Sequence, residues 1–105
     1  MVIVRGSILF GLGGIFIEVL KDVKAALAPV GKQEALELIK WLRGYKILKG
    51  VRGQEPVNEE LFADTIARVS ALVEVAPEIA EMDLNPLLGT SKSITAVDAR
   101  IRVEK

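Results

Sequence analysis

Residues 79–103 read IAEMDLNPLLGTSKSITAVDARIRV, and this stretch holds two runs of alternating side chains on either side of a polar turn. The first run covers residues 79–88 and the second covers residues 94–103. The turn between them, residues 89–93, consists of glycine, threonine, serine and lysine. Alternation with a period of two is typical of half-buried strands. We therefore predict an antiparallel β-hairpin at this end of the chain.

Two amphipathic helices are predicted upstream of the hairpin. Apolar residues recur at helical spacing in residues 31–43 and again between Asn58 and Pro77. The Asn58 side chain can cap the second helix by accepting a hydrogen bond from its first turn, and Pro77 ends that helix. Residues 44–56 hold three glycines and a proline, so they are predicted to form a loop.

Strands are also predicted at the start of the chain. Residues 2–12 are rich in β-branched side chains, residues 15–23 alternate, and residues 24–30 continue as a bent or second strand. Strands, two helices and then strands indicate the α+β class, with a mainly antiparallel sheet and two helices. The length of 105 residues predicts a single domain over residues 1–105.

The composition excludes several classes of function. The chain has 14 Lys and Arg against 14 Asp and Glu, so it lacks the excess positive charge that is typical of a nucleic-acid-binding protein. It has no Cys and no His, which excludes disulfides, thiolate or imidazole metal ligands and a His base. Its most apolar stretch, residues 7–20, is too short for a membrane span. We expect a cytoplasmic protein with neither a nucleic acid nor a membrane as its partner.

The polar side of the hairpin is the strongest candidate for chemistry. Glu81, Asp83 and Asn85 share one side of the first strand, and Asp98 lies on the facing strand. Carboxylate and amide oxygens that converge across a ladder suit Mg²⁺ or Mn²⁺. The same alternation also fits a solvated polar face of a half-exposed sheet. Spacing alone leaves both interpretations open.

Two glycine-containing segments are weaker candidates. The run FGLGG at residues 10–14 allows either a close backbone approach to phosphate or a bulge between strands. It matches neither a dinucleotide fingerprint nor a P-loop. Arg52, which precedes Gly53 in the predicted loop, can clamp a phosphate or remain a solvated loop charge.

The chain resembles one family along nearly its whole length. FGLGGIFIEVLKDVKAALAPV, EALELIKWLRGYKILKGVRG, PEIAEMDLNPLL and AVDARIRV follow in one register. They are similar to segments in the ATP-grasp domain of NDP-forming (ADP-forming) acyl-CoA synthetases, which include acetate–CoA ligases. Succinyl-CoA synthetase β subunits carry related segments. The resemblance covers the C-terminal part of the ATP-grasp fold.

This resemblance implies roles for individual residues. Asn85 in DLNP and Asp98 in VDAR match the family's Mg²⁺–nucleotide ligands, and Asp83 matches an acidic residue that supports the metal. The implied nucleotide-binding residues are Gly13, Gly14 and Glu18 near the phosphates, together with Arg52 of the RG loop. No catalytic residue is implied within this chain. The implied cofactors are Mg²⁺ (or Mn²⁺) and ATP or ADP.

The resemblance also implies partners. The lysines and the flap that hold the phosphates lie upstream of FGLGG in the family, and the phosphorylated His lies elsewhere. We therefore expect the Mg–nucleotide half of an acid–CoA ligase, inactive alone, whose partners are a missing N-terminal ATP-grasp half or a CoA-binding subunit. The alternatives are a non-catalytic subunit and a self-associating structural module that completes such a site in trans. A sheet edge near residues 2–10 predicts a homo-oligomer.

Overall fold

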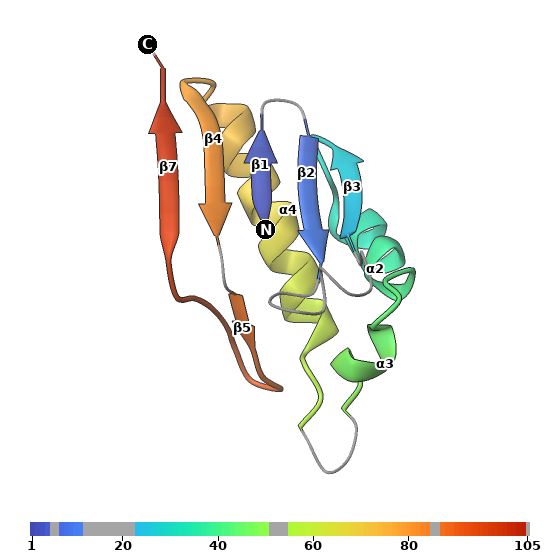
Figure 1. Ribbon diagram of the computed structural model, residues 1–105. Helices are drawn as coiled ribbons and strands as arrows, with labels where there is room; N and C mark the ends of the chain where they lie inside the picture. The colour runs from blue at the N-terminus through green and yellow to red at the C-terminus, as the bar shows by residue number, and fades with distance from the viewer. Residues whose placement is uncertain (5–6, 12–22, 51–54, 85–86, 105) are drawn as a thin grey trace.

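The computed structural model describes residues 1–4, 7–11, 23–50, 55–84 and 87–104. Five strands form an antiparallel sheet in the order β3-β2-β1-β4-β7, and a two-stranded ladder, β5-β6, continues below it (Figure 1). The strands are β1 (Val2–Val4), β2 (Ser7–Gly11), β3 (Val23–Leu27), β4 (Ile79–Leu84), β5 (Leu87–Gly89), β6 (Ile94–Ala96) and β7 (Ala99–Val103). The described helices are α2 (Lys32–Lys40), α3 (Tyr45–Leu48) and α4 (Glu59–Val75). The prediction of an α+β fold with a mainly antiparallel sheet is confirmed.

The first predicted strand is in fact two strands. β1 and β2 form a hairpin in which Val4 pairs with Ser7 and Ile3 pairs with Ile8. β1 also pairs with β4, so it lies in the middle of the sheet. The predicted sheet edge near residues 2–10 is therefore wrong, because β3 and β7 form the edges.

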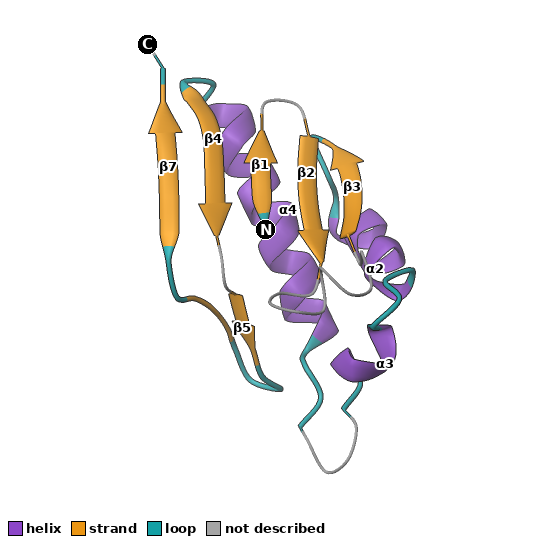
Figure 2. Ribbon diagram, viewed as in Figure 1, coloured by secondary structure: helices purple, strands orange, loops and turns teal. Residues whose placement is uncertain are grey.

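Helices α2 and α4 lie on one face of the sheet, and the core fills the space between the two layers (Figure 2). Side chains from β1, β2 and β4 alternate toward this core, which contains Ile3, Ile8, Phe10, Ala26, Ile39, Phe62, Ile66 and Met82. The rings of Phe10 and Phe62 meet edge to face, with centroids 5.9 Å apart. One polar side chain, Ser70, is also fully buried among the described residues, where its hydroxyl accepts a hydrogen bond from the Val30 N–H at 2.7 Å.

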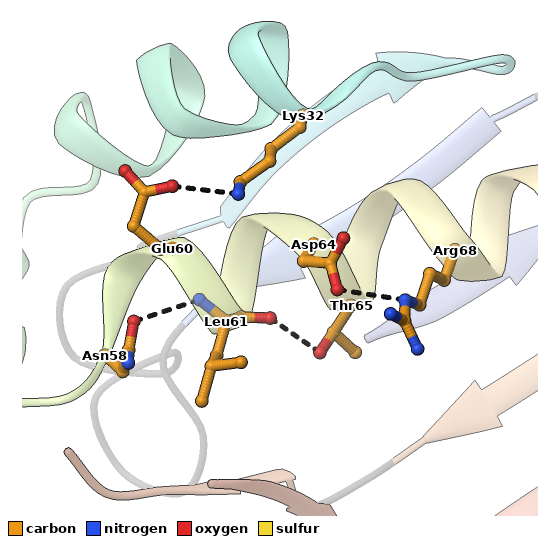
Figure 3. A network of polar contacts seen from close by, with 7 residues as sticks. All are labelled: Lys32, Asn58, Glu60, Leu61, Asp64, Thr65 and Arg68. Carbon is orange, nitrogen blue, oxygen red and sulfur yellow. Dashed lines mark hydrogen bonds and ion pairs between the residues drawn. The ribbon is translucent and has the colours of Figure 1, made fainter. Parts of the chain in front are cut away.

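The predicted helices are present with adjusted ends. The first ends at Lys40 rather than at residue 43. The second begins after Asn58, whose Oδ1 accepts a hydrogen bond from the Leu61 N–H at 3.0 Å, which confirms the predicted cap (Figure 3). The predicted loop over residues 44–56 contains a third, short helix, α3. Tertiary contacts explain it, because Leu48 is buried and the Tyr45 hydroxyl donates a hydrogen bond to Glu59 at 2.6 Å.

The C-terminal hairpin is confirmed, although it is interrupted. β4 pairs with β7 from Leu84↔Ala99 outward, and β5 pairs with β6 from Leu87↔Ala96 to Gly89↔Ile94. Both ladders keep the same register, apart from a shift in β4 between Ile79 and Glu81. The second predicted strand breaks at residues 97–98, between β6 and β7.

Several predictions fall outside the described residues. They are most of the strand predicted over residues 15–23, the glycine pair Gly13 and Gly14, and Glu18, Arg52 and Asn85. Residues 24–30 do contain strand β3, which ends at Leu27. None of the helices in the described part of the chain has the length and apolar character of a membrane span.

Candidate functional site

The sheet has a second face, which points away from the helices. Alternation along β4 buries Ala80 and Met82 in the core and turns Glu81 and Asp83 to this open face. A groove of about 350 Å³ lies over it. The residues of this face that line the groove come from β1, β4 and β7: Val2, Val4, Glu81, Asp83, Arg100 and Arg102.

Two arginines of β7 supply positive charge to this groove. Arg100 is the cross-strand partner of Asp83, and Arg102 is the partner of Glu81. The Arg102 guanidinium lies 3.3 Å from a Glu81 carboxylate oxygen and also contacts Glu104. Its hydrogen bond to Glu81, followed by the one to Glu104, raises the pKa of Arg102. Arg102 is therefore already an ion-pair partner of Glu81 in this arrangement.

Asp98 lies just before β7 and is joined to the same cluster. Its Oδ2 atom is 3.7 Å from the Nε of Arg100, whose side chain is 83% exposed. An ion pair this long and this exposed to solvent is a weak interaction. Arg100 is also the cross-strand partner of Asp83, so Asp83 and Asp98 are both neighbours of Arg100.

Asp83 has an unusual environment. Its Oδ1 atom is buried and has no hydrogen-bond partner among the described residues. The nearby Met1 amino group donates instead to the Leu84 carbonyl, at 2.8 Å. Burial lowers the pKa of that amino group, and the negative charge of Asp83 opposes the shift. Buried polar atoms in native proteins are nearly always paired, so this oxygen has unused capacity for a cation or a donor.

The donor chemistry fits a hard divalent cation. Mg²⁺ takes one or two carboxylates and completes its shell with water and phosphate oxygens. Asp98 and the unpaired oxygen of Asp83 supply carboxylates of this kind. The described residues contain no cluster of three or more His, Cys, Asp or Glu side chains suited to a metal, so an all-protein metal cage is not formed by them.

The structure brings together some of the predicted site residues. Asp83 lines the groove, and Asp98 forms an ion pair with Arg100, which also lines it. The roles of both aspartates as metal ligands remain predictions. Asn85, Gly13, Gly14, Glu18 and Arg52 lie outside the described residues, so their predicted roles also remain predictions. No role was predicted for Arg100 or Arg102 from the sequence. The signal was present, because the alternation in ARIRV places both on the side of Asp98.

Comparisons with known proteins give one consistent result. Residues 6–103 match the model of an ATP-grasp domain. The chain is 50% identical over 95 residues to the β subunit of ADP-forming acetate–CoA ligase I from Pyrococcus furiosus, a match that covers 90% of this chain and 41% of the relative. The chain thus spans less than half the length of that curated relative.

Solved structures agree with this result. The acetyl-coenzyme A synthetase 1 of Ca. Korarchaeum cryptofilum, in complex with coenzyme A and acetyl-coenzyme A, superposes with a TM-score of 0.91 at 41% identity, over 98% of this chain and 48% of that one. Another structure of the same protein holds coenzyme A and Mg-AMPPCP, and superposes with a TM-score of 0.89 over 98% of this chain and 51% of that one.

Proposed function

The chain belongs to the ATP-grasp domain family, and on this premise we propose that it supplies the magnesium–nucleotide half of an ADP-forming acyl-CoA ligase. The observation that carries the proposal is the buried, unpaired Oδ1 of Asp83, at a groove that also holds two arginines. A carboxylate for a metal and guanidinium groups for phosphate are the two kinds of side chain that a metal–nucleotide complex requires. The Mg-AMPPCP bound to the Korarchaeum relative supports this assignment.

We assign the metal to Asp98 and Asn85, with Asp83 as a supporting ligand. Asn85 and Asp98 are selected by the family motifs DLNP and VDAR, and Asp83 is selected by its buried, unpaired Oδ1. A bound Mg²⁺ supplies charge neutralisation and orientation of the nucleotide phosphates. Arg100 holds Asp98 in the free protein, and its exposed guanidinium can turn to a phosphate oxygen when the cation takes its place.

The remaining nucleotide contacts belong to residues that the resemblance selects. Gly13, Gly14 and Glu18 are assigned to the phosphate end of the nucleotide. Arg52 is assigned to a loop near it. These assignments rest on the family motif and not on geometry.

The rest of the ligase is expected from outside this segment. The P. furiosus relative is more than twice as long as the aligned region, and the Korarchaeum chain likewise. Stabilisation of a transferring phosphoryl group needs preorganised charge on all its sides. We therefore propose that this chain binds the metal–nucleotide complex and that turnover needs the N-terminal ATP-grasp half and a CoA-binding partner, joined covalently or added in trans.

Binding of Mn²⁺ tests the proposed site. Water-proton relaxation of Mn²⁺ should report weak binding to the wild-type chain and tighter binding when ADP or ATP is added. Asp83→Asn should weaken Mn²⁺ binding about tenfold, the lower end of the range for supporting ligands. Asp98→Asn should weaken it further, because it removes a direct carboxylate ligand.

Asp64→Asn is the matched control. Asp64 carries the same charge and pairs with Arg68 on the surface of α4, at 2.9 Å and away from the groove (Figure 3). This variant should bind Mn²⁺ as the wild type does. Equal affinities in the wild type, Asp83→Asn and Asp98→Asn would refute the site.

A further inference from the structure

The helix side of β7 is an apolar surface that the described part of the chain leaves uncovered. Ile101 pairs with Met82 across the ladder, so both side chains lie on the same face. Met82 is only 3% exposed, whereas Ile101 is 53% exposed. Val103, two residues further along β7, is 54% exposed. The hydrophobic core therefore stops abruptly between two neighbouring strands.

The width of the elements explains why it stops. An α-helix with its side chains is about 10 Å wide, and neighbouring strands are about 4.8 Å apart, so one helix covers roughly two strands. α2 and α4 lie behind β3, β2, β1 and β4, with α2 on the β3 side (Figure 1). Two helices thus cover about four strands. The fifth strand, β7, has no helix behind it among the described elements.

One flank of α4 continues this surface. Glu60 faces α2 through an ion pair with Lys32 at 3.0 Å, and Leu61 points to the other side of the helix (Figure 3). Leu72 follows Leu61 by about three helical turns, so it projects from the same flank. Leu72 is 44% exposed, and Val75, one turn further, is also exposed. A short turn then leads to Ile79, the cross-strand partner of Val103.

These residues form one strip, made of Leu72 and Val75 of α4 and Ile101 and Val103 of β7. We propose that this β7 strip is the docking surface of an amphipathic helix, contributed by the part of the ligase that lies outside the region matched here. The inference rests on the proposed function, in which this chain works together with the rest of an ADP-forming ligase. Apolar patches of this kind on a soluble protein mark sites of interaction.

Two observations select this occupant. The Korarchaeum chain superposes over 98% of this chain, but the superposed part is only 48% of its own length. That longer chain therefore carries the same arrangement of strands and helices together with further segments. A second copy of this chain fits less well. An antiparallel β7–β7 pair centred on Ile101 would place Arg100 opposite Arg102 twice, and like charges directly opposite each other are destabilising.

Lysine substitutions in two contexts test the proposal. The double variant Ile101→Lys, Val103→Lys is made in this chain and in a chimera. The chimera is the P. furiosus β subunit with its aligned region replaced by this chain. In this chain the guanidinium chloride midpoint should change little, because both side chains are half exposed. In the chimera the midpoint should fall by roughly 0.5 M or more, because the lysines would be buried under the docked helix.

Leu27→Lys is the matched control. Leu27 lies on the other edge strand, β3, and is 78% exposed, so its substitution should change little in either context. Mn²⁺ binding should also be unchanged in the double variant. Ile101 and Val103 point to the face opposite to Asp83 and Arg100, so loss of Mn²⁺ binding would concern the proposed function and not the strip.

Two results would overturn the proposal. One is a midpoint that the lysines change equally little in both contexts. The other is light scattering that reports a dimer of this chain which the lysines convert to a monomer, because the occupant would then be a second copy. If the chimera does not fold, the same lysines are placed at the aligned positions of the P. furiosus subunit itself, where an unchanged midpoint would count against docking.

Discussion

Replacing Ser70 with alanine should destabilise the protein more than its small change in size suggests. The Ser70 side chain is fully buried, and its Oγ accepts a hydrogen bond from the Val30 N–H at 2.7 Å. Val30 is itself only 3% exposed and lies directly before Gly31, which begins α2 without a side-chain cap. This hydrogen bond therefore ties the entry of α2 to the middle of α4.

The expected loss of stability follows from the Val30 N–H, which stays buried after its acceptor is removed. Alanine removes the acceptor but leaves the Val30 N–H buried, and an unsatisfied buried donor costs about 1–3 kcal/mol. The free energy of unfolding of a domain of this size is roughly 5–15 kcal/mol, so the loss is a substantial share of its stability. At about 5 °C per kcal/mol, a loss near the middle of this range lowers the Tm by roughly 10 °C.

Thermal and urea unfolding followed by circular dichroism measure this loss. Ser93→Ala is the matched control, since the Ser93 side chain is exposed and its only described side-chain contact is a hydroxyl pair with Thr90 at 3.3 Å. This control should change stability by less than about 0.5 kcal/mol. A Ser70→Ala variant as stable as Ser93→Ala would show that the Val30 N–H has another partner, and would refute the reasoning.

Two further predictions concern ionisation and turnover. Tyr45 is the one tyrosine of the chain, and its hydrogen bond to Glu59 raises its pKa, so tyrosinate absorbance should report a midpoint above 10 that Glu59→Gln brings down. A phenol with a raised folded-state pKa adds stability that is fully present below its unfolded pKa of about 10 and is lost as the pH rises through the folded value. A midpoint that Glu59→Gln leaves unmoved would contradict this. The purified chain alone should form no acyl-CoA from ATP, a carboxylic acid and coenzyme A, because it spans only 41% of its P. furiosus relative, and product above background would disprove the expectation.

Some features of the candidate site at the open groove could be predicted from the sequence, and others could not. Alternation within β4 correctly predicted that Glu81 and Asp83 share a face, and the short turn predicted the facing strand, although Asp98 lies just before β7 and not on a strand. Both features depend on residues close in sequence. The ion pairs of Arg100 and Arg102 depend on which carboxylates stand opposite them, so the sequence prediction could not assign them.

Local chemistry in the sequence was enough for the elements that need no distant partner. The cap at Asn58, the helix that follows it and the register of the terminal hairpin are set by neighbouring residues, through hydrogen bonds and periodicity. The family was likewise recognisable from contiguous motifs. Such features are encoded within a few turns of chain, so they can be identified before any tertiary contact is known.

Only the tertiary structure decided the order of strands and the state of the buried polar groups. Met1 and Leu84 are separated by 83 positions, yet they exchange backbone hydrogen bonds that place β1 at the centre of the sheet. Nothing local distinguishes a central strand of three residues from an edge strand. Similarly, the burial of Ser70 and the unpaired oxygen of Asp83 arise from the packing of segments distant in sequence. Such contacts stabilise the protein only once the layers are assembled, because each contact requires the closure of a long loop of chain.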